Sequence, residues 1–150
     1  MVIPALLFSQ TKALVGGTLI DGFGNAPIKN SVILIEGETI LKVGTVETVT
    51  IPDGVEIIST EGMSVLPGLW DMHVHLMITG HSDYAYWDKT YLPLFQNVIM
   101  PASAHQLLLA GVTSARDLGG PLESSIDVKE RINQGPLSLH SIRRYADFPR

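Results

Sequence analysis

Short runs of alternating and β-branched residues dominate the first 60 positions of the chain. These runs are KALVGGTLID (12–21), NSVILIEGETILKVG (30–44) and VEIIST (55–60). Residues of these types favour strands, and Glu36-Gly37-Glu38 predicts a hairpin turn inside the second run. The cluster DGFGNAP (21–27) is typical of a loop. Because no helical period interrupts this segment, it predicts a small β-sheet or sandwich.

The pattern changes after Gly62. An extended run, MSVLPGLWDMHVHL (63–76), is followed by the polar and aromatic stretch 77–91, which predicts a long loop. Residues after Pro101 have helical spacing up to Gly111, a typical glycine at a helix C-terminus. A strand (112–120) and a second helix (122–135) are predicted next. This alternation is typical of βα units, whose strands pair in parallel.

The sequence therefore predicts an α/β plus β protein with three parts. They are a β segment (1–62), the start of an α/β segment (63–135) and a tail (136–150). No internal repeat is present.

Composition narrows the function classes. The chain has 150 residues, of which 45% are hydrophobic, and a net charge of −5, so one core fits and a nucleic-acid partner is not expected. The arginines near the end (Arg143, Arg144, Arg150) are interpreted as a solvated terminus. Cysteine is absent, which excludes disulfides and thiolate metal ligands.

No apolar run reaches the length of about 18 residues that a membrane-spanning helix needs, so no membrane partner is expected. The compartment is not fixed by the sequence. A cytoplasmic location is favoured, with a secreted or periplasmic one if MVIPALLFSQ is the remainder of a signal peptide.

One stretch carries candidate chemistry. Asp71, His73 and His75 are spaced two apart in an extended run, so their side chains are predicted to share one face of a strand. Neutral imidazoles suit zinc and related divalent ions, which make hydroxide available near neutral pH. The spacing alone leaves open whether these are ligands or two incidental strand histidines.

The stretch VLPGLWDMHVHL (65–76) resembles the first barrel strand of the amidohydrolase superfamily. Residues 13–44 are similar to the small β-sandwich that flanks the barrel, and LLLAGVTSARDLGG (107–120) resembles the following helix and second strand of the imidazolonepropionase-like and prolidase-like branch. The resemblance covers residues 12 to about 135. It implies an N-terminal β-sandwich segment followed by the first βα units of a TIM-like (β/α)8 barrel, truncated.

The resemblance also implies roles for individual residues. His73 and His75 match metal ligands, and Asp71 matches a supporting residue. Arg116 and Asp117 match the end of the second strand, either in a structural role or as support for the metal ligands. The implied cofactor is a divalent metal, zinc foremost, with one or two ions in the intact site. The implied activity is hydrolysis of C–N bonds in small amide or dipeptide-like substrates through a metal-bound hydroxide.

The family's remaining site residues have no match in this chain. These are a lysine, two histidines and an aspartate from later strands; Lys89 and Lys129 are predicted in a loop and a helix and do not replace the lysine. His81 could face substrate from its loop, His105 is predicted in a helix as a surface or packing residue, and His140 lies in the tail. The chain alone is therefore expected to be inactive.

The sequence after Gln134-Gly135 departs from the family, which predicts a frameshift, a truncated gene or a partial sequence. A non-catalytic remnant or interaction module with a vestigial metal site is the alternative. Unpaired strand edges predict poor solubility, with oligomerisation or aggregation.

Overall fold

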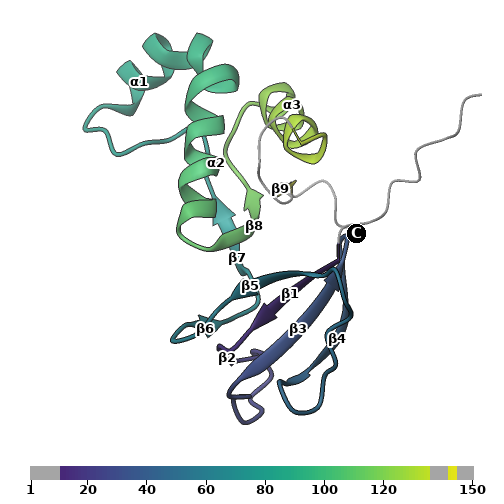
Figure 1. Cartoon of the computed structure of the whole chain (residues 1–150). Coiled ribbons are helices and arrows are strands. Elements are labelled where there is room, and N and C mark those ends of the chain that lie inside the picture. The colour runs from purple at the N-terminus through teal and green to yellow at the C-terminus, as the bar shows by residue number, and fades with distance from the viewer. Residues whose placement is uncertain (1–10, 136–141, 145–150) are drawn as a thin grey trace, which may run out of the picture. The chain divides into compact units, whose positions relative to one another are not determined.

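The computed structural model describes residues 11–135 and 142–144. The chain forms two compact units that divide between Pro67 and Gly68 (Figure 1). The sequence places the change of character after Gly62, and that assignment of domains stays a prediction. Over the described ranges, every helix is too short or too polar to span a membrane.

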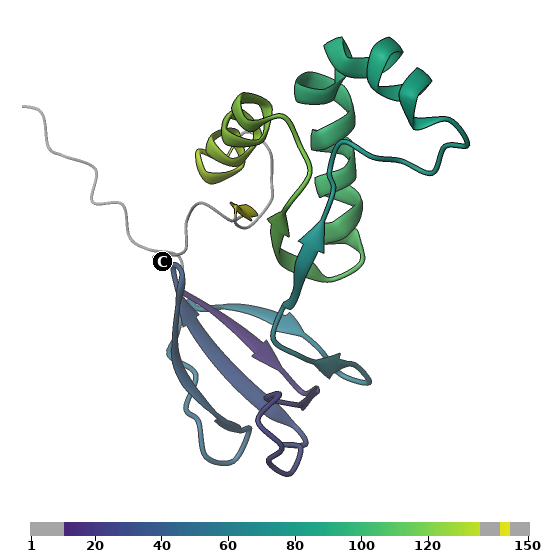
Figure 2. The same ribbon diagram turned by 180° about the vertical axis from the view of Figure 1, so that it is seen from behind.

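The first unit is a mixed β structure of two sheets. Its four-stranded sheet has the order β4-β3-β1-β5, and its two-stranded sheet pairs β2 with β6. The strands are β1 (Thr11–Val15), β2 (Thr18–Leu19), β3 (Ser31–Glu36), β4 (Thr39–Thr45), β5 (Glu56–Ser59) and β6 (Ser64–Val65). The hairpin predicted at 36–38 joins β3 to β4, and Gly37 adopts a φ of 57° that glycine tolerates. In contrast to this antiparallel pairing, β1 and β5 run parallel (Figure 2).

The core of this unit lies on its two central strands. Ala13 of β1 and Val32, Ile33 and Leu34 of β3 are buried, together with Val49 from the loop after β4. The edge strands β4 and β5 instead leave apolar side chains exposed. The described part of the unit therefore buries only its middle.

Thr60 ties the first strand to the loop that follows it. Its Oγ1 accepts a hydrogen bond from the Gly17 N–H (3.0 Å) and donates one to the Val15 carbonyl (3.0 Å). The residue is buried. These bonds hold the chain at the step from β1 to β2, where it leaves one sheet for the other.

Replacing Thr60 by valine keeps the shape of the side chain but removes both hydrogen bonds. A buried polar group left unpaired costs about 1–3 kcal/mol, so we expect a loss of that size in the free energy of unfolding. Urea denaturation, or hydrogen exchange of amides in β1, measures it. Thr50→Val at an exposed position is the control; equal stability of the two variants would contradict the role of Thr60.

The second unit is a parallel three-stranded sheet with helices. β7 (Leu69–Val74), β8 (Val112–Asp117) and β9 (Ile142–Arg144) lie in that order, and both pairings are parallel. The helices are α1 (Tyr84–Tyr91), a 3-10 turn (Leu92–Leu94), a π-helical turn (Phe95–Ile99), α2 (Met100–Leu109) and α3 (Leu122–Asn133). In Figure 1, α2 runs beside β7 and β8. The predicted βα alternation and the parallel pairing of β7 with β8 are confirmed.

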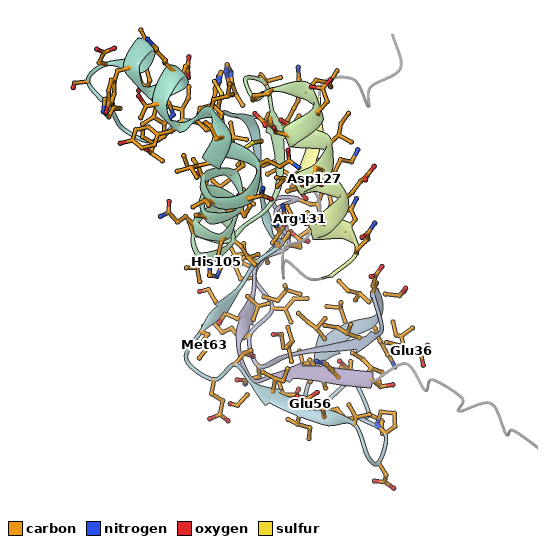
Figure 3. The ribbon with its side chains drawn as sticks, turned by 90° about the horizontal axis from the view of Figure 1, so that it is seen from above. Glu36, Glu56, Met63, His105, Asp127 and Arg131 are labelled. Carbon is orange, nitrogen blue, oxygen red and sulfur yellow. The ribbon has the colours of Figure 1, made fainter. Side chains whose placement is uncertain are left out.

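One hydrophobic core joins the sheet to the helices of this unit. Its buried members are Val74, Leu76, Trp87, Phe95, Met100, Ala104, Ala115, Val128 and Ile132. Phe95 is the largest of the nearly inaccessible side chains. Arg131 of α3 adds a polar link, since its Nη1 donates to the Gln96 carbonyl (3.3 Å) and lies 3.1 Å from Asp127 Oδ2 (Figure 3).

The sequence patterns did not predict helix α1, the two helical turns over residues 92–99, or strand β9. The stretch expected to be a loop contains α1, which begins at Asp83, whose Oδ1 accepts the Tyr86 N–H (3.0 Å). Trp87 then anchors the helix by packing in the core and donating its Nε1–H to the Met77 carbonyl (3.0 Å). Strand β9 lies in the tail, where no strand was expected.

The described chain therefore has mixed sheets and few helices, and no closed barrel is present among residues 11–135 and 142–144. Arg143 and Arg144, predicted as part of a solvated end, belong to β9 through their backbone. His140 and Arg150 lie outside the described residues.

Candidate metal centre

His73 and His75 converge at the carboxyl end of β7. The Nε2 atoms of the two rings are 3.1 Å apart, and the ring centroids are 5.1 Å apart. In a regular strand, residues two apart are separated by about 6 to 7 Å along the chain. The two side chains therefore tilt toward each other rather than standing parallel, and both are exposed.

An irregularity in β7 accompanies this convergence. The register with β8 shifts between Asp71 and Val74, as in a β-bulge, so the strand is locally distorted just before it ends. The Asp71 carboxylate accepts the backbone N–H of His73 at 3.0 Å. Asp71 therefore supports the backbone of one histidine.

The residues that alternate with the histidines lie in the core. Val74 and Leu76 are buried, as the period of two predicts, and they fix which side of the chain His73 and His75 occupy. Met72 departs from this pattern, because it is exposed. The alternation therefore holds at the end of β7, where the histidines are, and not at its middle.

The two imidazoles fit a divalent ion. Zinc–nitrogen bonds are about 2 Å long, so two nitrogens close to 3 Å apart can bind the same ion. The two Nε2 atoms lie within hydrogen-bond distance of each other, and both rings would ligate an ion through Nε2 in their neutral form. No cluster of three or more His, Asp or Glu side chains suited to a metal is found in the described part of the chain. The described residues therefore offer two ligands to a divalent ion.

The loop after β8 packs directly against His75. A Cβ placed on Gly119 would overlap the His75 ring at Nδ1 and lie 2.9 Å from its Cγ. Gly119 donates its N–H to Asp117 Oδ1 (3.2 Å), and Asp117 Oδ2 accepts from Ser125 Oγ (2.9 Å). Both Asp117 and Ser125 are almost fully buried. Asp117 thus holds the loop that carries Gly119, and its role stays a prediction; Gly119 and Ser125 were not among the residues predicted from the sequence.

Two open hollows adjoin this end of the sheet. The first, about 360 Å³, has His75 in its wall together with polar side chains such as Thr79, Ser103 and Gln106. The second, about 350 Å³, is lined by Gly119 and by residues that include Met77, Asp88 and Phe95. Their volumes fall in the range of small-molecule sites.

The other histidines are placed elsewhere. His81 lies before α1, where its Nδ1 accepts the Asp83 N–H (3.0 Å) and its ring packs 5.5 Å from that of Trp87. His105 is exposed on α2 (Figure 3). Of the lysines considered, Lys89 lies in α1 rather than in a loop, and Lys129 lies in α3 as predicted. Neither His81 nor His105 joins His73 and His75 in a group of three or more possible metal ligands among the described residues.

No family model matches the chain, and no curated protein matches it. Solved structures do match: molinate hydrolase is 28% identical, with 91% of this chain and 29% of that one covered and a TM-score of 0.75. An amidohydrolase is 21% identical, with 90% and 31% covered and a TM-score of 0.75.

A Xaa-Pro dipeptidase with methionine bound in its active site is 22% identical, with 90% and 33% covered and a TM-score of 0.69. At such identities, the last two likenesses concern the fold alone. The chain spans about a third or less of the length of these three structures. It has the fold of the N-terminal region of amidohydrolases, which confirms the resemblance seen in its sequence.

Proposed function

We propose that this chain provides the first metal-ligating strand of a metal-dependent hydrolase of C–N bonds, with His73 and His75 as ligands of a divalent ion, zinc foremost. The observation that carries the proposal is the 3.1 Å separation of the two Nε2 atoms. The parallel strands β7 and β8 would then be the first two strands of a barrel, with the site at their carboxyl ends.

Each residue around the pair has a distinct task in this proposal. His73 and His75 bind the ion, and Asp71 holds the His73 backbone through the 3.0 Å hydrogen bond. When bound, the ion supplies Lewis acidity and a nucleophile near neutral pH. Val74 and Leu76 anchor the strand in the core, which keeps both imidazoles on the exposed side.

Small amide or dipeptide-like molecules are the proposed substrates of the intact enzyme. The dipeptidase among the structural neighbours supports this class. Catalytic zinc sites use three protein ligands and an open position. With two ligands gathered among its described residues, the chain by itself is proposed to be inactive.

The same observation supports a second candidate. A site of two imidazoles and no third ligand in the described ranges is also what a non-catalytic remnant or interaction module would keep. Zinc binding together with turnover of an amide substrate supports the enzyme. A chain that shows neither zinc binding nor turnover supports the remnant.

Zinc titration of the full chain tests the two ligands. We expect zinc to shift the ring ¹⁵N resonances of both histidines, and His73→Ala or His75→Ala to weaken binding by at least the 10–100-fold known for residues that merely support ligands. His105→Ala, on an exposed helix position, is the control and should bind as the wild type does. Equal zinc affinity of the wild type and the double variant His73→Ala/His75→Ala would contradict the proposal.

A further inference from the structure

Glycine at position 119 is explained by the space around it, not by its backbone conformation. Gly119 is not among the glycines with positive φ, so its backbone would accept any residue. A Cβ here would overlap the Nδ1 edge of the His75 ring, so the imidazole would have to move to make room for it. Glycine is therefore the residue that leaves the imidazole in its present position.

The segment that carries Gly119 is fixed at both of its ends. At the strand end, the Leu118 N–H donates to the Val74 carbonyl at 3.0 Å, which ties the segment to β7. At the helix end, Ser125 donates its N–H to the Pro121 carbonyl (3.0 Å) and its hydroxyl to Asp117. Asp117 closes the segment by accepting the Gly119 N–H at 3.2 Å.

From these contacts we infer that Gly119, held by the buried Asp117–Ser125 pair, is a positioning residue that fixes the orientation of the His75 imidazole. The backbone at Gly119 forms a wall against the Nδ1 edge, so the opposite edge, with Nε2, is directed toward His73. This inference rests on the proposed function, because positioning matters only if His75 is a ligand.

The expected benefit is preorganisation. An exposed histidine samples several rotamers, and a ligand that must be ordered on binding lowers metal affinity. His75 follows the last residue of β7, so pairing within the sheet does not fix its side chain. The backbone of the loop after β8 restricts the His75 side chain instead, and it leaves Nε2 accessible.

The test is zinc affinity of Gly119→Ala in the full chain, by titration followed through histidine ring ¹⁵N resonances. We expect binding 10–100-fold weaker than in the wild type, the range for residues that orient metal ligands. Gly80→Ala is the matched control, since Gly80 has no neighbour within 4 Å of a Cβ and no positive φ, and it should bind zinc as the wild type does. Affinity of Gly119→Ala within twofold of the wild type would overturn the inference.

Ser125→Ala is the second variant, needed because Gly119→Ala can also disturb folding. It removes the hydroxyl that holds Asp117 but adds no atom near His75, and we expect zinc binding several-fold weaker with a native spectrum. If Gly119→Ala does not fold, wild-type affinity in Ser125→Ala overturns the inference.

The metal-free protein separates this inference from the proposed function. The χ1 couplings of His75 should report one dominant rotamer in the wild type and averaging in Gly119→Ala. If the wild type binds no zinc, the proposed function fails, while these couplings still decide the positioning role. Identical couplings in the two proteins overturn it.

Discussion

Phe95→Ala should unfold the second unit of the chain. Phe95 is 1% exposed and is one of the largest side chains in a core that also contains Trp87, Met100 and Val128. Truncating a buried phenylalanine to alanine costs about 3–5 kcal/mol, through lost burial and the cavity left behind. Because whole domains are stable by only about 5–15 kcal/mol, this single change removes a large part of the stability.

Hydrogen exchange measures the effect locally. We expect amides of β8 and α3 to lose protection in Phe95→Ala while amides of β1 and β3, in the first unit, keep theirs. Phe23→Ala is the control, because Phe23 is 88% exposed in a loop and its removal leaves no cavity. Equal protection of β8 in both variants would show that Phe95 does not hold the second unit together.

The second large effect concerns association of the purified chain. Both edge strands of the four-stranded sheet expose apolar side chains, with Ile40 of β4 at 62% and Ile57 of β5 at 61%. Edge strands with exposed apolar residues pair with other chains unless charges interrupt them. We expect the wild-type chain to elute as a mixture of monomer and larger species in size-exclusion chromatography.

A lysine on each edge should reverse this behaviour. The double variant Ile40→Lys/Ile57→Lys is expected to raise the monomeric share several-fold. Thr50→Lys/Gln134→Lys is the control, since it adds the same charge at exposed polar positions away from these two edge strands and should behave as the wild type. A wild-type monomer with a sharp, cooperative thermal transition would contradict the prediction.

Local patterns predicted much of the secondary structure. The β3–β4 hairpin, β8, and the helices α2 and α3 follow from β-branched runs, helical spacing and glycines such as Gly111, whose φ is +86°. Helix α1 was missed because its stabilising contact, Trp87 to the Met77 carbonyl, joins the helix to the loop ten residues earlier. Strand β9 was missed because pairing with the distant β8, not its own pattern, creates it.

The candidate site was predictable in its residues and not in its geometry. The period of two placed His73 and His75 on one side, opposite Val74 and Leu76. The 3.1 Å distance between their Nε2 atoms depends on contacts that the local pattern does not contain. One is the register shift between β7 and β8, and the other is the backbone at Gly119, which lies more than 40 residues later in the chain. The pair Gly119-Gly120 indicates that another group packs closely against the backbone there, but the sequence alone does not identify His75 as that group.

The parallel pairing of β1 with β5 also determines the order in which the strands of the first sheet can pair during synthesis. The β3–β4 hairpin needs a turn of two residues and forms in about 1–10 μs, whereas β1 meets β5 only after residues 16–55 close a loop. Ribosomes add about 5–20 residues per second, so the first three strands are complete about a second or more before β5 has been made. During every round of synthesis, β1 therefore waits as an open edge, and the nascent chain is then most exposed to pairing with the wrong strand.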